Sequence, residues 1–294
     1  MIPIEGQLRR RRKWVGLALR VGRLLWRQQQ TTGQVVQASY DRIAGGYDEA
    51  WTDHMRDLTD AMLGRLVVRP GDEAIDLTCG TGYLSGQLLA RGVGSVVGVD
   101  ASSGMVDAAC DNYPDAEFVC FDALKYLRRR PSGSADIVTS GWGLGYCSPR
   151  AVIGEIRRVL RPGGRAAIID NSLFSLAGVL WASFRAFAEY PDALQHVMKV
   201  KFLPHSIVLA SLMRLAGLGV AARGDGARTY AVDDGQAALA RLRATGAAAG
   251  FELAASSEQT RTVFDRFAEI IQADCAPGPV RIVHRYLWAL GVRI

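Results

Sequence analysis

The sequence predicts an α/β protein built on a doubly wound, mostly parallel β-sheet. The first observation is a series of short apolar or β-branched runs, several of which end in a carboxylate. The second is that stretches with helical periodicity separate these runs, as expected where crossover helices join parallel strands. The third is a glycine-rich turn at residues 78–82, between a strand and a helix, which is typical of a nucleotide-binding βαβ unit.

Seven strands are expected in this sheet. The first is predicted in the short run from Glu73 that ends in the carboxylate of Asp76, and the next four are predicted at residues 95–100, 117–122, 136–143 and 165–170. Residues 233–250 are interpreted as a helix followed by the sixth strand, and Val280 to Leu290 as the last strand. The turn Arg161-Pro162-Gly163-Gly164 ends the helix before the fifth strand, because proline and glycine both disfavour its continuation.

Length and composition narrow the class of protein. A chain of 294 residues with 49% hydrophobic and 22% charged residues has the balance of a globular protein with a large core. Its five cysteines are scattered and form no Cys-x-x-Cys pair, so neither a disulfide framework nor a metal site is indicated. We therefore expect a cytoplasmic protein.

The net charge of +6 is concentrated at the N-terminus, where the first 30 residues carry +7 and the remainder −1. No broad cationic surface for nucleic acid is expected on the body of the protein. Residues 1–34 are predicted to form a basic, amphipathic helical arm, distinct from a domain over residues 35–294. Its apolar positions Trp14, Leu17, Val21 and Leu24 or Leu25 recur at helical spacing.

Two interpretations of the arm stay open. An apolar stripe bordered by arginines and tryptophans suits the surface of an anionic membrane, which would place the protein peripherally on the inner face. Alternatively, the stripe packs against the protein's own domain or a second subunit, which leaves a homo-oligomer open. The arginines interrupt the apolar runs, so we expect neither a membrane-spanning helix nor a secretory signal, whereas a transit peptide stays open.

The carboxylates at the strand ends predict the ligand. Asp76 precedes the glycine turn and suits a ligand that carries an ammonium group, whereas Ser85 replaces the third glycine typical of NAD-binding loops. Asp100 lies 24 residues further on, close to the spacing at which an acidic side chain binds a ribose diol. The alternative for Asp100 is a helix cap. These features favour S-adenosylmethionine over NAD.

A family resemblance rests on these motifs and on two Tyr-Asp pairs upstream. The order Asp76-x-x-Cys79-Gly80-Thr81-Gly82, Asp100, Asp122 and Arg161-Pro162-Gly163-Gly164 resembles the class I S-adenosylmethionine-dependent methyltransferases, which have a Rossmann-like fold. The pairs at 40–41 and 47–48 and the Cys-Gly-Thr-Gly loop resemble the branch that methylates ubiquinone and menaquinone precursors. The resemblance covers residues 35–170, with a weaker match of Gly250-Phe251-Glu252 to the start of the sixth strand.

The resemblance implies a set of cofactor-binding residues. Asp76, Gly80 and Gly82 would hold the methionine end of the cofactor, and Asp100 the ribose. Met105 would lie against the adenine, although it equally fits a core position on a helix. The resemblance implies further members of the cofactor site. Two tyrosines, Tyr40 and Tyr47, would cover the cofactor, and Asp122 would lie at the adenine amino group. Neighbours in the loops are Cys79, Ala101, Ala123 and Ser140.

An apolar interval at residues 171–230 departs from a minimal methyltransferase. Residues 173–184 and 207–218 are rich in leucine, alanine and aromatic residues. We expect a helical lid over a hydrophobic small-molecule acceptor such as a quinone, lipid or secondary metabolite, the alternative being an oligomer interface. Methyl transfer needs a base only where the acceptor is not already nucleophilic. Candidate bases are His205, His196 and Asp170.

Three functions therefore remain in competition. The first is methyl transfer to a hydrophobic acceptor at the membrane surface. The second, within the same class, is methylation of a phospholipid headgroup amine. The third is an S-adenosylmethionine-binding protein without transferase activity, which would use the lid as an interaction surface. An NAD-dependent oxidoreductase is disfavoured by Ser85.

Overall fold

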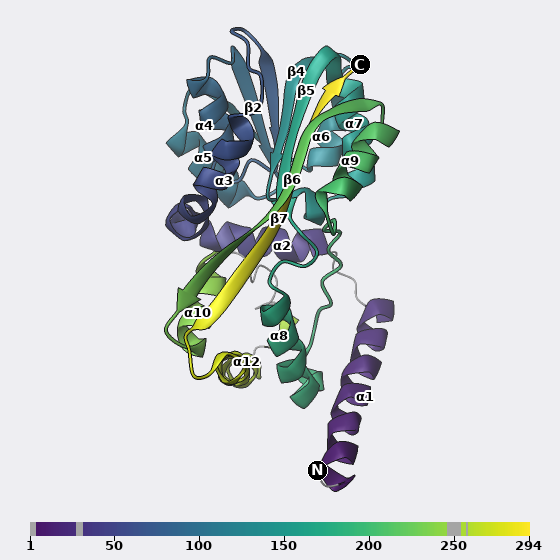
Figure 1. The fold of residues 1–294 in the computed structure, drawn as a ribbon, viewed down its shortest axis with the longest axis vertical. Coiled ribbons are helices and arrows are strands. Elements are labelled where there is room, and N and C mark those ends of the chain that lie inside the picture. Colours follow the sequence, from purple (N-terminus) through teal and green to yellow (C-terminus); the bar gives the residue numbers. More distant parts are fainter. Residues whose placement is uncertain (1–3, 28–31, 246–253, 257) are drawn as a thin grey trace. The chain divides into compact units, whose positions relative to one another are not determined.

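The computed structural model describes residues 4–27, 32–245, 254–256 and 258–294 (Figure 1). Its strands are β1 (Glu73–Leu77), β2 (Ser95–Asp100), β3 (Glu117–Cys120), β4 (Ala135–Gly141), β5 (Leu160–Asn171), β6 (Leu218–Val232) and β7 (Val280–Arg293). Its α-helices are α1 (Ile4–Arg27), α2 (Thr32–Ile43), α3 (Asp53–Leu63), α4 (Tyr83–Ala90), α5 (Ser103–Asn112), α6 (Ala123–Arg129), α7 (Pro149–Val159), α8 (Ala177–Glu189), α9 (Ser206–Leu215), α10 (Gly235–Ala244) and α12 (Thr260–Cys275).

The strands form one seven-stranded sheet in the order β3-β2-β1-β4-β5-β7-β6. The pairs β1–β2, β1–β4, β2–β3 and β4–β5 are parallel, and β7 is antiparallel to β5. The order reverses between β1 and β4, so their carboxyl ends open on the crevice where ligands bind in such sheets. The prediction of a doubly wound, mostly parallel, seven-stranded sheet is confirmed.

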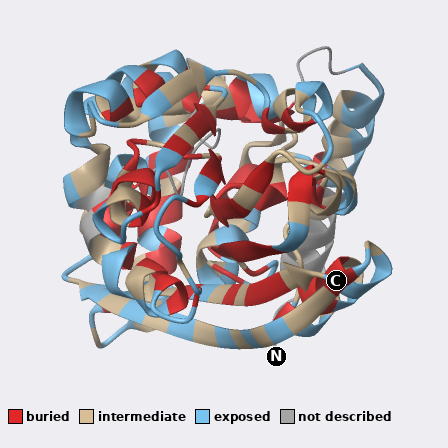
Figure 2. Cartoon of the chain, turned by 90° about the horizontal axis from the view of Figure 1, so that it is seen from above, coloured by how far each residue is buried: buried red, intermediate tan, exposed pale blue. Residues whose placement is uncertain are grey.

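Alternating residues of the sheet enter two cores on its opposite faces. Ala74, Ile137 and Ala167 point to the face covered by α3 and α4, where Leu63 and Leu88 are fully buried. Their chain neighbours point to the other face, which α6, α7 and α9 cover (Figure 1). Buried residues accordingly follow the strands and the inward faces of the helices (Figure 2). This burial on both faces explains why the strands are continuous apolar runs.

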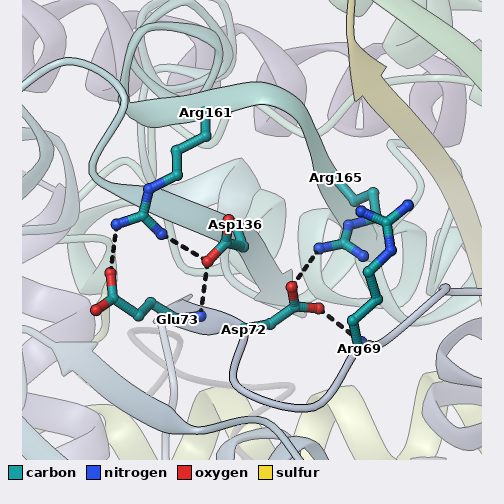
Figure 3. Close-up of polar contacts among 6 residues, drawn as sticks. All are labelled: Arg69, Asp72, Glu73, Asp136, Arg161 and Arg165. Atoms are coloured by element: carbon teal, nitrogen blue, oxygen red, sulfur yellow. Dashed lines mark hydrogen bonds and ion pairs between the residues drawn. The ribbon is translucent and has the colours of Figure 1, made fainter.

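Ion pairs link the strands at the amino edge of the sheet (Figure 3). Arg161 donates to Asp136 at the start of β4 and to Glu73 at the start of β1, both at 2.6 Å. Arg165 on β5 donates to Asp72 at 2.8 Å, and both side chains are buried. The arginine of the Arg-Pro-Gly-Gly turn thus has a structural role at the edge remote from the strand ends that carry the cofactor motifs.

The position of the sixth strand corrects a prediction. A strand was expected near residue 250, but residues 246–253 lie outside the described residues. β6 instead occupies 218–232, and all but its last two residues fall in the interval 171–230 assigned to a helical lid. Gly224 and Gly226 on β6 face rings of β7, and a Cβ at these positions would lie 2.7 Å from Trp288 and 2.4 Å from Tyr286. The small residues are required by these rings, and they gave β6 the composition of a loop.

The remaining lid prediction is met in part by two helices in different surroundings. By their contacts the described residues divide into two units. The sheet unit comprises residues 40–175, 200–227 and 284–294, and the helical unit residues 1–39, 176–199 and 228–283. α9 belongs to the sheet unit, where Leu209 and Met213 enter the core, whereas α8 belongs to the helical unit. The boundary between an arm and a single domain at residue 34 stays a prediction.

In the helical unit, α12 packs against α8 and α10, and α1 packs against α8. The apolar stripe predicted on α1 faces inward, because Leu17 is buried and Trp14, Val21 and Leu24 pack on the same core. The stripe is therefore used within the protein's own unit, as the alternative interpretation held. Among the described residues, no helix combines the length and the apolar character needed to cross a bilayer.

Candidate functional site

The loop after β1 has the backbone shape of a ligand-binding turn. Thr78, Gly80 and Gly82 all have positive φ, at 54°, 54° and 87°. A Cβ at Gly82 would lie 2.8 Å from the ring of Tyr113, so only glycine allows α4 and α5 to pack here. A Cβ at Gly80 would meet nothing within 4 Å, which leaves open space above the turn. The loop could therefore admit a ligand close to its backbone.

Asp100 connects this loop to the end of β2. Its Oδ2 accepts from the backbone N–H of Gly80 at 3.0 Å, and its Oδ1 accepts from the N–H of Ser102 at 2.9 Å. Burial raises the pKa of Asp100 above its ordinary value, and these backbone hydrogen bonds oppose the shift. The helix cap of α5 is instead Ser102, whose side chain accepts from the N–H of Met105. The carboxylate of Asp100 could bind two neighbouring hydroxyl groups.

Asp76, which is predicted to hold the methionine end of the cofactor, lies near the end of β1, beneath the loop. It is completely buried, and its two oxygens accept from Ser85 Oγ at 2.7 Å and Thr139 Oγ1 at 2.8 Å. Burial raises the pKa of Asp76 to about 6. Its direct contacts hold β1, β4 and α4 together beneath the loop, and Ser85, noted in the sequence for replacing a glycine, is one of its two partners.

The two Tyr-Asp pairs fasten the segment before the sheet to the ligand loops. Asp41 accepts from Ser102 Oγ at 2.6 Å and from the N–H of Gly104 at 3.2 Å. Asp48 accepts from Thr81 Oγ1 at 2.5 Å and from Asn112 Nδ2 at 3.1 Å. One aspartate thus binds the loop after β2, and the other the loop after β1.

The tyrosines of these pairs form an aromatic cluster beside Asp100. The ring centroid of Tyr40 lies 5.8 Å from that of Tyr47 and 6.3 Å from that of Tyr146, and Phe202 continues the cluster at 5.3 Å from Tyr146. Burial raises the pKa of each of the three tyrosines, that of Tyr146 to about 12, so their hydroxyls stay neutral at physiological pH. Rings in this position could cover a bound nucleoside or sulfonium.

The end of β4 faces the loop after β1. Ser140 Oγ lies 3.2 Å from Thr78 Oγ1, and the next turn contains Trp142 with φ of 61°. Thr78 and Trp142 are two of the three non-glycine residues with positive φ in the described chain. Such conformations cost free energy and concentrate at functional sites, which agrees with the location of this site between β1 and β4.

Asp170, a predicted base, lies at the end of β5 beside this aromatic cluster. It is buried, its Oδ2 accepts from the N–H of Gly145 at 2.7 Å, and its Oδ1 accepts from the N–H of Asn171 at 2.8 Å. Burial raises its pKa to about 7. The carboxyl group of Asp170 therefore exchanges a proton near neutral pH, as a base requires.

A cavity of about 510 Å³ lies beyond the end of β5 in the same unit. Segment 201–205 connects it to the aromatic cluster, because Lys201 N donates to Gly145 O at 2.7 Å and Leu173 N donates to Leu203 O at 2.9 Å. The ring of His205 lies 5.5 Å from that of Phe174, and His205 Nδ1 lies 3.9 Å from Asp225. The lining residues are Ser172, Phe174, His205, Asp225, Gly226, Ala227, Arg285 and Tyr286.

The remaining predicted residues have simpler surroundings. Asp122 caps α6 by accepting from the N–H of Lys125 at 2.8 Å, and the side chain of Met105 is buried in the core. His196 belongs to the helical unit, where burial lowers its pKa, so the structure groups only His205 and Asp170 in one unit. The other predicted residues lie at the ends of β1, β2 and β3, where Cys79 and Ala123 are buried and Ala101 is exposed.

Comparisons with known proteins fit this geometry. A family described as "Methyltransferase domain" matches residues 75–168. The demethylmenaquinone methyltransferase of Beutenbergia cavernae is 34% identical over 60% of this chain and 75% of its own length. The 2-phytyl-1,4-naphtoquinone methyltransferase of Trichormus variabilis is 32% identical over 46% of this chain and 64% of its own length. This chain belongs to the class I S-adenosylmethionine-dependent methyltransferases.

The fold of the methyltransferase agrees with that assignment. A structure described as a putative methyltransferase of Bacillus halodurans superimposes with a TM-score of 0.56 over 80% of this chain and 98% of its own, at 14% identity. Because the chain belongs to this family, S-adenosylmethionine is its cofactor, and the protein is an enzyme that transfers the methyl group of that cofactor. The open space above Gly80, the carboxylate of Asp100 and the neighbouring rings fit such a cofactor.

Several residues of the candidate site were missed from the sequence. Tyr146 lies in the loop after β4, and the only signal for it was its position beside Gly143 and Gly145 in that loop. Phe202 carried no signal, since its partner Tyr146 is 56 residues away in the chain. Asp41 and Asp48 were visible within the Tyr-Asp pairs, but their partners in the two loops were not.

Proposed function

We propose that this methyltransferase methylates an apolar, quinol-type acceptor, and that the acceptor binds in the cavity at the end of β5. The cavity is the observation that carries the proposal. Its volume of about 510 Å³ is in the range of small-molecule sites, and two aromatic rings, Phe174 and Tyr286, line it together with Ala227 and Gly226. The named activities of two relatives, on demethylmenaquinone and 2-phytyl-1,4-naphtoquinone, support the same acceptor class.

The cofactor is proposed to bind between the loops after β1 and β2. Gly80 and Gly82 give the backbone access, Asp100 binds the ribose hydroxyls, and Tyr40 and Tyr47 cover the ligand. Asp76 acts from beneath by fixing the loop through Ser85 and Thr139. We propose the finer assignments on the same basis. Met105, Ala101 and Cys79 would lie beside the adenosine, and Asp122 and Ala123 at the adenine edge. Ser140 would lie near the methionine end.

The chemistry follows from this arrangement. The bound cofactor supplies an electrophilic methyl group, so the residues of the chain have to orient the acceptor, exclude water and accept a proton. Asp170 is proposed to accept that proton, because its pKa of about 7 leaves it largely deprotonated just above neutral pH. His205 is the second candidate, and its Nδ1 lies 3.9 Å from Asp225 in the wall of the cavity. Delivery of an apolar acceptor further favours action at a membrane surface.

The test is methyl transfer from labelled S-adenosylmethionine to a short-chain naphthoquinol, with phosphatidylethanolamine in parallel. Phe174→Ala is expected to raise KM for the quinol about tenfold, because the ring lost from the cavity wall reduces the apolar contact. The matched control is Leu215→Ala on α9, which removes an exposed apolar side chain that does not line the cavity. Equal KM values for the two variants would refute the cavity assignment.

The pH profile separates the two bases. With Asp170 as the base, log kcat/KM rises with pH and levels off above about 7, and Asp170→Asn abolishes this rise. A profile that His205→Gln alone alters would transfer the role to the histidine. Methylation of phosphatidylethanolamine but not of the quinol would establish the lipid alternative, and tight cofactor binding without any product would establish the non-catalytic one.

A further inference from the structure

A second apolar stripe, which the sequence pattern did not single out, lies on the outward face of α1. Leu17 and its neighbours on the inward face are packed on the helical unit. On the outward face, Val15, Leu19 and Trp26 are 57%, 67% and 83% exposed. At about 100° per residue these three positions share one narrow arc, roughly opposite Leu17. These exposed apolar residues therefore do not belong to the face by which α1 packs on the helical unit.

This arc continues onto α8 within the helical unit. Trp14, at the edge of the packed face of α1, stacks on Trp181 of α8 with ring centroids 5.5 Å apart. Leu25 and Ala18 lie between Trp14 and the exposed arc on the helix surface, and both are exposed. Trp181 is itself exposed, and two further exposed apolar residues of α8, Leu180 and Phe184, lie within one turn of it.

The opposite border of the arc is cationic. Arg23 and Arg27 are exposed on the neighbouring arc of α1, and the guanidinium of Arg27 lies 5.6 Å from the ring centroid of Trp26. Two other cations hold the helix in place instead, because Arg20 Nε donates to Leu194 O at 2.7 Å and Lys13 pairs with Glu189. The charge of the first 30 residues is +7, so the surface beside the arc repels a cationic partner and attracts an anionic one.

We propose that this two-helix surface, defined as Val15, Leu19, Leu25, Trp26, Leu180, Trp181 and Phe184 with Arg23 and Arg27 at its border, binds an anionic phospholipid bilayer. Tryptophan rings at the junction of apolar and cationic residues suit the headgroup level, and arginines suit anionic lipid. A second copy of the chain is a poorer partner, since a symmetric contact would bring two arginine borders together. The proposal rests on the proposed function only in that the acceptor resides in the membrane.

The experiment is flotation of the full chain with phosphatidylcholine vesicles, with and without phosphatidylglycerol. Wild type is expected to float with the anionic vesicles and to be released by salt, which screens attraction beyond about 10 Å at 0.1 M. Leu19→Ser/Trp26→Ser on α1 and Leu180→Ser/Phe184→Ser on α8 are each expected to weaken the partition coefficient by about tenfold or more. Arg23→Gln/Arg27→Gln is expected to remove most of the dependence on phosphatidylglycerol.

The matched control is Leu215→Ser, an 83% exposed apolar residue on α9 outside the surface, which is expected to float as wild type does. Point variants are preferred to deletion of α1, since the deletion would uncover the core around Leu17. Circular dichroism and thermal unfolding verify that each variant is folded. The proposal would be overturned if wild type failed to float, or if the α8 variants floated normally. It would also be overturned if the variants changed only the mass measured by light scattering, because that result would indicate a protein partner.

Methyl transfer to the water-soluble quinol is measured on the same preparations. Lost flotation with intact transfer in the surface variants is the expected result. Transfer that fails in wild type while flotation succeeds would refute the proposed function and leave the surface standing. Transfer that succeeds while wild type does not float would refute the surface and leave the proposed function standing.

Discussion

The carboxylates at the two edges of the sheet have different kinds of partner. At the amino edge, Asp72, Glu73 and Asp136 each contact an arginine, and Arg165 and Arg161 supply the compensating charge (Figure 3). At the carboxyl edge, Asp100 and Asp170 are hydrogen-bonded to neutral donors, namely backbone N–H groups. Asp76, beneath the first loop, is held by two hydroxyls.

The difference has an energetic consequence. A carboxylate that loses hydration without gaining a cation has a raised pKa, and Asp76, Asp100 and Asp170 all show this shift, with burial as its largest cause. An arginine there would stabilise the fold, but it would compete with a cationic cofactor for the carboxylates. The amino edge therefore contributes stability, whereas the carboxyl edge keeps its acidic groups for a ligand.

The largest effect is expected from Asp72→Ala at the amino edge. The change leaves Arg165 buried without its carboxylate and removes an acceptor of the Arg69 N–H at 2.7 Å. Unfolding free energy measured by urea denaturation should fall by about 3–5 kcal/mol. Cofactor affinity of the folded protein should not change. The double variant Asp72→Leu/Arg165→Met should recover much of the loss, and no recovery would show that shape at this site matters more than charge.

Asp100→Ala at the carboxyl edge should have the opposite effects, a large loss of cofactor affinity and a smaller loss of stability. Loss of the carboxylate removes the proposed ribose contact, so the affinity for S-adenosylmethionine by calorimetry should fall about 30- to 100-fold, or roughly 2–3 kcal/mol. Stability should decrease less than in Asp72→Ala, because none of the ion pairs among the described residues involves Asp100. Asp111→Ala, which removes an exposed aspartate of α5, is the control. Equal affinities of the two variants would remove Asp100 from the site.

A smaller effect, with a defined pH window, is expected from Asp76. Its folded pKa of about 6 exceeds the unfolded value of about 3.9, so the folded protein retains a proton that the unfolded chain has already released. The stability that Asp76 contributes should therefore decline as pH rises from about 4 to about 6 and then stay level. Asp76→Asn lacks this titration. The difference between the unfolding free energies at pH 4.5 and at pH 7, measured by denaturation curves, should therefore be about 1–2 kcal/mol smaller in the variant than in wild type. An unchanged difference would contradict the raised pKa.

The sequence predicted what local patterns encode. The strands up to residue 170 and the loop at Gly80 follow from apolar runs, carboxylates and glycines next to one another in the chain, and the last strand was placed correctly from residue 280. β6 was not, since its glycines face Trp288 and Tyr286 on a strand about 60 residues away, and this pairing leaves no trace in local composition. Tertiary contacts thus override propensity where an edge strand is built from small residues.

The candidate site was predictable to the same limited depth. Tyr40 and Tyr47 were singled out because a repeated Tyr-Asp pair does not fit core periodicity, whereas Phe202 and the partners of Asp41 and Asp48 depend on contacts between distant segments. The spacing of Trp14, Leu17 and Val21 correctly indicated an amphipathic helix. It could not indicate whether this stripe would contact a membrane or pack on the protein itself, and it did not include the exposed apolar residues on the opposite side of α1.

The smallest effect is expected from Arg161→Gln, the exposed counterpart of the buried pair. Arg161 contacts Asp136 and Glu73 at 2.6 Å, but its side chain is 38% exposed, so water screens both interactions. The variant should lose at most about 1 kcal/mol of unfolding free energy, and the loss should shrink in high salt. Asp72→Ala measured under the same salt conditions should keep most of its cost, because that pair is only 8% exposed. Equal salt sensitivity of the two variants would mean that burial does not separate the two pairs, and the amino edge would then be held by surface charge alone.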